Sequence, residues 1–378
     1  MATSRIAIIG TGVIGAMTAW QLTRRGAEVL AFDAHSPGHD RGASAGESRI
    51  FRTIYKEGPG YVPLLQRSRG LWRDLERTSG SDLLAMCGGL TIGRADHPDV
   101  QAVRRCAEGH RLDHEVLDAN RSRERFPQHA VDDDEVAVFD PAAGVLRPEL
   151  AVQAALHAAE ASGATLLPHH PVQEVSETAR GWRITSNGKD FDADHVVFAP
   201  GPWASRLEPL RGLPVEVRLI TACWWAARDH AAHLPDRLPI TIRRHREAGF
   251  SCFPSLDGAS IKTVPHHLGY PVLDGPDALP RNASPEFVRA ASAAAARLLP
   301  GVVPHPIRIG TYAEGFTPDE HALLGALPGL RNATVMTGFS GHGFKLAPVF
   351  GEIGADLVLT GGTAHDIDHL DPSRFTNA

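Results

Sequence analysis

The sequence has no long apolar run and no excess of basic residues. No uninterrupted apolar stretch approaches the roughly 18 to 20 residues that a helix needs to span a bilayer, which argues against membrane insertion. Lysine and arginine number 38 against 44 acidic residues, so the formal net charge is −6 and the basic footprint of a nucleic-acid-binding protein is missing. Internal repeats, coiled coils and low-complexity tracts are also missing. With 378 residues, 43% of them hydrophobic and 22% charged, the chain fits a soluble globular protein of two domains, or of one large domain with an insertion.

Cysteine is scarce, and the histidines are not arranged as metal ligands. The four cysteines lie far apart without a CxxC pair, which argues against a disulfide framework and a structural zinc site and suits a reducing compartment. Neither His169-His170 nor His266-His267 has the spacing of metal ligands on a helix, so we predict no metal site. The cysteines are Cys87, Cys106, Cys223 and Cys252.

The clearest functional motif lies near the N-terminus. A short apolar run at 6–9 is followed by GTGVIG at 10–15. In a strand–turn–helix unit, Gly10 allows the bend and Gly12 lets the backbone approach a pyrophosphate, while Gly15 lets the helix pack tightly on the strand. The phosphates would lie at the amide groups of the helix N-terminus, where the helix dipole favours negative charge.

The surrounding residues favour dinucleotide binding over a glycine-rich turn that binds nothing. Ala19 and Leu22 continue the sheet-facing side of the helix, Gly26 ends it, and a second strand is predicted at 28–32. A secretory signal fits poorly, because three glycines break the apolar run and an amphipathic helix follows it in place of a cleavage site. We therefore expect a cytoplasmic protein.

Asp33 indicates which dinucleotide is preferred. It ends the second predicted strand, about 20 residues after Gly10, where a carboxylate can accept hydrogen bonds from a ribose diol. Ala34 and His35 follow, and no arginine is positioned to hold a 2′-phosphate. NADP is therefore disfavoured.

The rest of the chain combines predicted helices with predicted strands. Residues 49–55 would place Arg49, Arg52 and Tyr55 on one face of a helix, and a solvated basic face explains that spacing equally well. Residues 111–143 look polar and irregular. Alternating segments from 213 to 272 indicate an antiparallel sheet. Helices are expected at 61–77, 99–109, 150–161, 285–299 and 348–359, hairpins at 172–194, and strands at 88–93, 165–167, 195–199, 308–312 and 334–337, the last two returning to the first domain.

Two further turns, APGPW at 199–203 and GFSGHGFK at 338–345, are rich in glycine. Glycine-rich turns near both ends of the chain, with a β-rich section between them, indicate a cofactor domain assembled from separated segments. We predict an α/β (α+β) fold with two domains. A Rossmann-like cofactor-binding domain would comprise residues 1–85, 144–212 and 308–378, and an antiparallel β-sheet substrate domain residues 86–143 and 213–307.

Taken together, these motifs resemble the monomeric sarcosine oxidase and N-methyltryptophan oxidase group of the D-amino-acid oxidase superfamily of flavoproteins. The resemblance covers nearly the whole length and implies FAD rather than NAD, with the isoalloxazine ring at the interface with the substrate domain. The most specific motif is GFSGHGFK, since the first is common to many dinucleotide folds. In the family's order the motifs are GxGxxG with Asp33, SRIFRTIY at 48–55, GVLRPE at 144–149, APGPW, PDEH at 318–321 and GFSGHGFK.

The resemblance also implies catalytic and substrate-binding residues. Arg52 and Lys345 match the pair that holds the substrate carboxylate, a role that suits two cations in a partly dry cleft. Lys262 matches the lysine near flavin N5 at which oxygen is activated, where a buried ammonium stabilises developing negative charge. An exposed strand lysine is the alternative for Lys262. His266 matches the family's active-site histidine.

The remaining implied residues contact the flavin or line the substrate pocket. Arg49 matches a residue close to the flavin, and Tyr55 and Ser251 are expected in the pocket. The expected FAD contacts are Gly10, Gly12, Val13, Ile14, Gly15, Asp33, Ala34, Gly42, Ser44, Ser48, Arg49, Val172, Ala199, Gly201, Trp203, Gly341, His342, Gly343, Phe344 and Lys345.

Two departures from the family pattern modify these expectations. Members usually attach FAD through a cysteine shortly before the PDEH segment, but no cysteine follows Cys252, and the position falls on Tyr312. We therefore predict dissociable, non-covalent FAD. Ala45 stands where a histidine is common, and Ser251 where sarcosine oxidases carry a tyrosine. The smaller side chains imply a roomier pocket, which favours a bulkier secondary or cyclic amino acid over sarcosine.

The predicted activity is oxidation of a secondary (N-methyl or cyclic) amino acid, with hydride transfer to FAD and reoxidation by O2 to hydrogen peroxide. The cationic cluster would lower the pKa of the substrate amine, so no protein base is strictly required. One alternative is a dehydrogenase of an amine or 2-hydroxy acid with another electron acceptor. A catalytically inactive flavin-binding module is disfavoured, because Arg52, Lys345 and Lys262 occur together. The expected partners are the small-molecule amine and O2, and family members of this length are often monomers.

Overall fold

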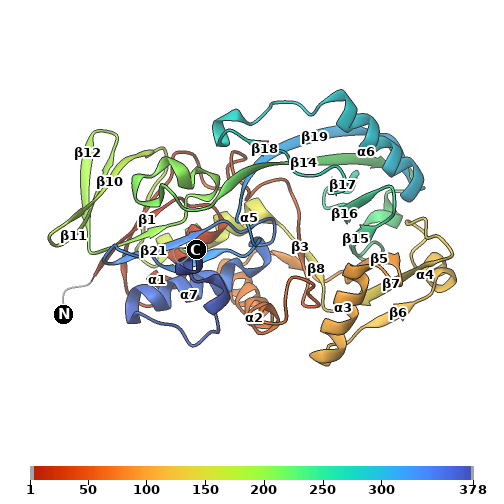
Figure 1. Ribbon diagram of the computed structural model, residues 1–378, viewed down its shortest axis with the longest axis horizontal. Coiled ribbons are helices and arrows are strands. Elements are labelled where there is room, and N and C mark those ends of the chain that lie inside the picture. The colour runs from red at the N-terminus through yellow and green to blue at the C-terminus, as the bar shows by residue number, and fades with distance from the viewer. Residues whose placement is uncertain (1–3, 376–378) are drawn as a thin grey trace.

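The computed structural model describes residues 4–375 and has two sheet-based parts, at the left and right of Figure 1. Residues 1–3 and 376–378, which the predicted cofactor domain includes, lie outside the described residues. In the left part a six-stranded sheet has the order β20-β21-β13-β1-β2-β9, in which β20 is antiparallel and the other strands are parallel. The strands are β1 (Arg5–Ile9), β2 (Glu28–Phe32), β9 (Thr165–Leu167), β13 (His195–Phe198), β20 (Leu323–Ala326) and β21 (Ala333–Thr337).

After the exposed Arg5, strand β1 is apolar because both of its faces are buried. Ile6 and Ile8 belong to a core shared with the helices on one face, whereas Ala7 and Ile9 belong to a core shared with a three-stranded sheet. Successive side chains of a strand point to opposite faces, so a central strand covered on both sides is a continuous hydrophobic run. The helices are α1 (Val13–Thr23), α2 (Tyr61–Ser79), α5 (Pro148–Ala161) and α7 (Ala347–Thr360), and the three strands are β10 (Val172–Thr178), β11 (Gly181–Ser186) and β12 (Lys189–Ala193).

The right part is a larger, mainly antiparallel sheet (Figure 1). Its order is β18-β14-β17-β16-β15-β5-β7-β6, with β19 paired to β14, and β15 and β5 are parallel. Helix α6 (Pro285–Leu298) covers one face, and α3 (Pro98–Gly109) packs beside β5. The strands are β5 (Gly89–Arg94), β6 (Glu115–Leu117), β7 (Glu135–Asp140), β14 (Glu216–Ala227), β15 (Ile240–Arg244), β16 (Gly249–Phe253), β17 (Ser260–Pro265), β18 (Val272–Leu273) and β19 (Val302–Phe316).

Three expectations about local structure were wrong. Residues 49–55 are not a helix, because Arg49–Phe51 forms strand β3 and pairs with β8 (Gly144–Leu146), which also pairs with β4 (Leu84–Ala85). Residues 111–143 are not irregular but contain β6, β7 and helix α4 (Ala119–Arg125), which Asp118 caps by accepting a hydrogen bond from the Arg121 amide. Residues 308–312 belong to the long strand β19, whose pairing with β14 keeps them in the second sheet.

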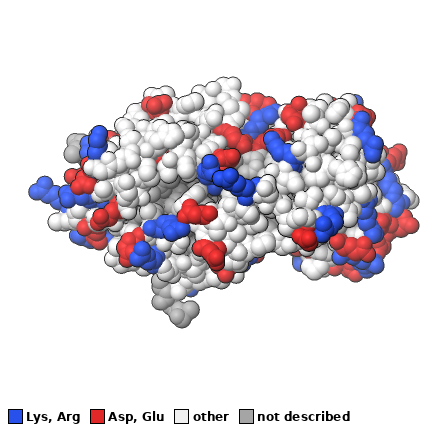
Figure 2. All heavy atoms as spheres, turned by 90° about the horizontal axis from the view of Figure 1, so that it is seen from above, with Lys and Arg blue, Asp and Glu red and all other residues white. Residues whose placement is uncertain are grey.

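The surface has no large patch of one charge sign on the face drawn in Figure 2, where basic and acidic side chains are interspersed. Within residues 4–375, no helix is both long enough and apolar enough to cross a bilayer.

Candidate functional site

A cavity of about 310 Å³ lies at the carboxyl ends of the parallel strands. The segments that follow β1, β2, β13 and β21 all contribute to its wall, because parallel strands end at the same edge of a sheet. This crevice is where open α/β sheets bind ligands. Its size falls in the range of roughly 300 to 1,000 Å³ typical of cofactor pockets.

The glycines of the first motif are required by close backbone approaches. Gly10 has φ +94°, and an added Cβ would lie 2.4 Å from the carbonyl oxygen of Ala199. A Cβ on Gly15 would lie 1.9 Å from the carbonyl oxygen of Gly10, so Gly15 permits tight packing below the loop. Gly12 precedes helix α1 and lines the cavity. The N-terminus of α1 therefore lies at the cavity wall, as an anion-binding loop requires, and its Val13 amide donates a hydrogen bond to the Ser44 hydroxyl at 3.0 Å.

Asp33 lines the same cavity at the end of β2. One of its oxygens accepts hydrogen bonds from the amide (2.8 Å) and the hydroxyl (2.9 Å) of Thr11. The other accepts one from the His35 amide at 2.9 Å and faces His39 Nε2 at 3.4 Å. Burial by itself would raise the pKa of Asp33, but these hydrogen bonds outweigh it and lower the pKa. A ribose diol would thus meet an ionised carboxylate and replace one of these neighbours.

Most of the predicted FAD contacts line this cavity. Gly15, Ser48, His342 and Lys345 do not. The predicted residues that line it are Gly10, Gly12, Val13, Ile14, Asp33, Ala34, Gly42, Ser44, Arg49, Val172, Ala199, Gly201, Trp203, Gly341, Gly343 and Phe344.

Sequence reasoning missed several lining residues, which include Thr11, His39, His170 and Glu314. Thr11 lies inside the glycine motif, and its bond to Asp33 could have been inferred from that spacing. His170 and Glu314 each lie two residues from a position the sequence did indicate, Val172 and Tyr312 respectively.

Lys262 is buried in β17, with 2% of its surface exposed. Its Nζ donates hydrogen bonds to the carbonyl oxygens of Gly46 at 2.7 Å and Ser48 at 2.6 Å, and it lies 4.2 Å from the ring centroid of Phe253. Glu47, between these two carbonyl groups, has φ +71°, and this left-handed turn lets both oxygens face one ammonium. Burial, and next the charge of Arg49, lower the pKa of Lys262 well below its usual range. The alternative of an exposed strand lysine is wrong.

Arg52 is the most incompletely paired cation near the cavity. Its Nη2 donates to both oxygens of Glu57, at 2.8 and 3.1 Å, while its buried Nε and Nη1 have no hydrogen-bond partner among the described residues. The Arg52 guanidinium outweighs the effect of burial on Glu57 and holds the pKa of that carboxyl at about 2. Unpartnered charged donors cost free energy when buried, so this guanidinium is prepared for an additional anion.

Lys345 and Arg52 both lie close to the ring of Tyr55. Its Nζ is 3.2 Å from the His342 carbonyl oxygen, 3.5 Å from the Tyr55 hydroxyl and 5.2 Å from the Tyr55 ring centroid, and the Arg52 guanidinium lies 4.9 Å from the same centroid. Burial, and then the charge of Arg52, lower the pKa of Lys345 to about 7. The two cations predicted to share a substrate carboxylate therefore both border one aromatic ring.

His266 and Ser251 lie away from the 310 Å³ cavity, among the described residues of the second sheet. His266 Nδ1 lies 2.9 Å from Arg244 Nη1, and burial together with that guanidinium lowers the pKa of His266 to about 3. The imidazole is therefore neutral, with Nδ1 as the acceptor. Ser251 lies opposite Ile242 and Val264 in the sheet.

Tyr312 fills the position at which the family usually carries its flavin-linking cysteine. An ideal Cβ at Gly46, which has φ +97°, would lie 3.0 Å from the Tyr312 hydroxyl oxygen. Gly46 thus makes room for this ring. The four cysteines are unpaired, and burial raises the pKa of Cys252 to about 12.

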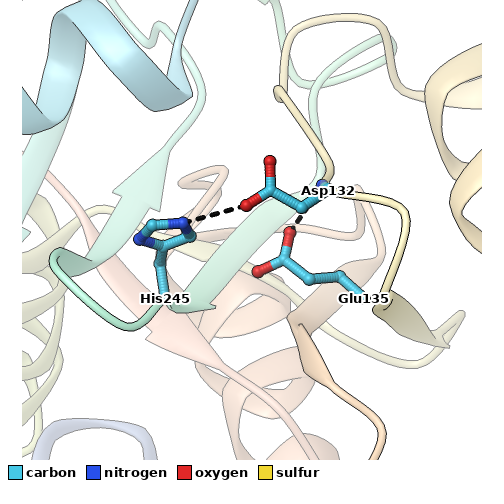
Figure 3. Close-up of side chains that lie close together, drawn as sticks. All are labelled: Asp132, Glu135 and His245. Atoms are coloured by element: carbon cyan, nitrogen blue, oxygen red, sulfur yellow. Dashed lines mark hydrogen bonds and ion pairs between the residues drawn. The ribbon is translucent and has the colours of Figure 1, made fainter.

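One group of potential metal ligands occurs in the described part of the chain, formed by Asp132, Glu135 and His245 (Figure 3). Both Glu135 oxygens already accept hydrogen bonds from Arg243, at 2.6 and 2.5 Å, and Asp132 is bonded to His245 at 3.1 Å. This arginine supplies the positive charge that a metal would provide. The group is accounted for as an ion-pair network.

Comparison with known proteins gives three consistent results. The family described as FAD dependent oxidoreductase (DAO) matches residues 5–357. Monomeric sarcosine oxidase of Streptomyces avermitilis is 36% identical over 99% of this chain and 98% of that protein, and N-methyl-L-tryptophan oxidase of Salmonella arizonae is 32% identical over 98% of each. The structure of NikD, an unusual amino acid oxidase essential for nikkomycin biosynthesis, matches with a TM-score of 0.87 and 26% identity over 98% of both chains.

Proposed function

The chain belongs to the DAO family of FAD-dependent oxidoreductases, and from this premise we propose that it oxidises a secondary, N-methyl or cyclic, amino acid. The observation that carries the proposal is the pair of unpartnered, buried guanidinium nitrogens on Arg52, next to Lys345. Charge-assisted, bidentate contacts make arginine well suited to a carboxylate. An α-amino acid supplies that carboxylate.

The wall of the cavity fits FAD. The α1 N-terminus and Gly12 would hold the diphosphate, Asp33 the ribose, and the 341–344 segment the ring system. Bound FAD would supply the redox chemistry, which is uptake of a hydride equivalent from the carbon next to nitrogen and delivery of the electrons to oxygen. The protein's own residues orient the substrate and stabilise charge.

Arg52 and Lys345 would fix the substrate carboxylate and thereby the position of its α-carbon. Glu57 already neutralises part of the Arg52 charge, and the cavity that adjoins Arg52 measures only about 10 Å³, about one water molecule. A substrate therefore has to displace Glu57 or shift the Arg52 side chain. Lys345, with its pKa near 7, gains its proton as the carboxylate arrives, because a neighbouring anion favours the charged ammonium.

Lys262 would act on oxygen rather than on the amino acid. Its ammonium is anchored by the Gly46 and Ser48 carbonyl oxygens and cannot swing away. A fixed positive charge in a buried site stabilises negative charge that develops on oxygen during its reduction. Arg49, held by the carbonyl oxygens of Ser48 and Ala43, adds a second positive charge at the cavity wall.

Small side chains at Ala45 and Ser251 favour a substrate bulkier than sarcosine. The test is anaerobic bleaching of the yellow protein by a panel of N-methyl and cyclic amino acids, each compared with the corresponding primary amino acid. Bleaching by a secondary amine, followed by hydrogen peroxide on readmission of air, supports the proposal. Bleaching without peroxide would indicate a dehydrogenase that uses another acceptor, and absence of bleaching by every amine and 2-hydroxy acid would indicate a flavin-binding module.

FAD would be held without a covalent bond, since Tyr312 offers no thiolate. Acid precipitation of the holoenzyme should leave the flavin in the supernatant, and yellow colour that remains with the precipitated chain would contradict this.

We further propose that the protein is a monomer. Its four unpaired cysteines suit a reducing compartment, and we propose the cytoplasm. We also retain the proposed division into an FAD-binding domain (1–85, 144–212 and 308–378) and a substrate-binding domain (86–143 and 213–307), except that residues 308–316 belong with β19 to the sheet of the substrate-binding domain.

A further inference from the structure

Two carboxylates line the 310 Å³ cavity within the described chain, Asp33 and Glu314. Both oxygens of Asp33 are engaged by Thr11, His35 and His39. Glu314 is engaged on one side only. Its Oε1 accepts a hydrogen bond from the Gly341 amide at 2.8 Å, and its Oε2 has no donor among residues 4–375.

The strand geometry directs Glu314 into the cavity. Glu314 lies near the end of β19, where side chains alternate between two faces, and the side chain of its neighbour Ala313 is fully buried. The residue opposite Glu314 on β14 is Arg218, which instead bonds Glu216 at 3.0 Å and lies over the Phe316 ring at 4.8 Å. The nearest cross-strand cation therefore does not neutralise this carboxylate.

Arg49 lines the same cavity as Glu314, and Lys345 contacts the carbonyl oxygen of His342, the residue that follows the Gly341 amide bonded to Glu314. Neither forms a hydrogen bond or ion pair with it, as Arg49 bonds to Ser48 and Ala43, and Lys345 faces His342 and Tyr55. A carboxylate on a cavity wall with one oxygen lacking a donor is stabilised by a further hydrogen bond. A ligand that brings a hydrogen-bonding cation would supply that hydrogen bond.

We propose that Glu314 accepts a hydrogen bond from the N–H group of the substrate amine. It would thereby select zwitterionic amino acids over plain carboxylic acids and 2-hydroxy acids. The inference rests on the proposed function, in which Arg52 and Lys345 hold the substrate carboxylate. In an α-amino acid the nitrogen is two bonds from the carboxyl carbon, so a negative group beside the Lys345 site is within its reach. Cations for the carboxylate and Glu314 for the ammonium then match both charges of one zwitterion, and Glu314 can take up the proton that the ammonium must lose before the hydride is transferred.

Burial raises the pKa of Glu314, although Arg49 opposes this effect. An arriving ammonium stabilises the ionised carboxylate and cancels part of the burial effect. A hydroxyl group of a 2-hydroxy acid can donate a hydrogen bond but brings no charge. The discrimination is therefore electrostatic as well as geometric.

The test compares piperidine-2-carboxylate with cyclohexanecarboxylate, which has the same ring and carboxylate but no nitrogen. Affinity for the first is measured as the half-saturating concentration for anaerobic flavin reduction, and affinity for the second as the dissociation constant from perturbation of the flavin spectrum. Glu314→Gln keeps a carbonyl oxygen for the Gly341 amide and removes the charge. Glu208→Gln, an exposed acid paired with Arg211, is the matched control.

We expect Glu314→Gln to weaken binding of piperidine-2-carboxylate roughly 10- to 100-fold, the worth of a hydrogen bond to a charged group. Binding of cyclohexanecarboxylate should be unchanged or tighter, and FAD content and melting temperature should match those of Glu208→Gln. Equal weakening of both acids, or no change in either, overturns the inference. So does a wild-type protein that binds both acids equally well or binds neither. If the wild-type flavin is reduced by none of the secondary amino acids, the proposed function fails; if it is reduced and the two acids respond alike, only the role of Glu314 fails.

Discussion

The pKa of Lys345 predicts how binding of a carboxylate depends on pH. A pKa near 7, compared with 10.5 in water, means that the site disfavours the ammonium by about 5 kcal/mol, mainly through burial and the neighbouring Arg52. Below pH 7 the lysine is charged before the ligand arrives. Above pH 7 it must take up a proton on binding, so the dissociation constant of a carboxylate should rise about tenfold per pH unit.

Two of the titratable groups that act on Lys345 have pKa values well below this range. The Arg52 guanidinium holds the pKa of Glu57 at about 2, and burial holds the pKa of His342 at about 4. Cyclohexanecarboxylate is a suitable probe, because it has no amine of its own to titrate.

The assay is a spectral titration of the FAD-bound protein with this acid between pH 6 and 9. The wild-type dissociation constant should be flat at low pH and break within about one unit of pH 7. Lys345→Met should bind roughly 100-fold more weakly at pH 6 and lose the break. A flat wild-type profile, or a break that persists in Lys345→Met, would refute this reasoning.

The low pKa of Lys345 should weaken carboxylate binding as the pH rises, but it should increase the folding stability over the same range. Between about pH 7 and 10.5 the unfolded chain binds the Lys345 proton and the folded protein does not, so stability rises with pH over that window. Lys345→Met removes the cost of burying the charge and should raise the melting temperature of the ligand-free protein at pH 6.

Three further predictions concern other parts of the molecule. Gly10→Ala should abolish FAD retention in the purified protein because its Cβ would meet the Ala199 carbonyl oxygen, whereas Gly26→Ala, also at positive φ (+82°) but in open space, should keep its flavin; equal flavin content in both variants would count against the role of the loop. Lys262→Met should slow reoxidation by oxygen in stopped-flow measurements much more than it slows flavin reduction, and similar losses in both half-reactions would contradict an oxygen site there. Glu135→Ala leaves the buried Arg243 guanidinium unpaired and should lower the free energy of unfolding by about 3–5 kcal/mol in urea titrations, and a loss below 1 kcal/mol would show that the ion pair matters little.

Sequence patterns within short segments correctly predicted the glycine loop with its flanking strand and helix, and the hairpins. The apolar run, the glycine loop and the helix after it show the spacing of residue types that their own structure requires, although β1 also pairs with β13 and α1 packs against α5 and α7. The β10–β12 hairpins pair with sequence neighbours. Residues 49–55 were misjudged because spacing alone does not distinguish a charged helical face from a strand that finds its partner, β8, far along the chain. The Asp118 cap was a local sign of helix α4 that could have corrected the expectation for 111–143.

The sequence by itself determined the dinucleotide loop, the FAD family and the absence of a cysteine where a flavin link would form, since each depends on residue identity at short spacing. Only the tertiary structure decided which charges meet. Tyr55 and Lys345 are 290 positions apart, and Lys262 finds its carbonyl partners 216 and 214 positions away. Such contacts, like the half-engaged Glu314, arise where β17, β19 and the turn after β21 converge beside β3, and that convergence depends on sheet pairing across the whole chain.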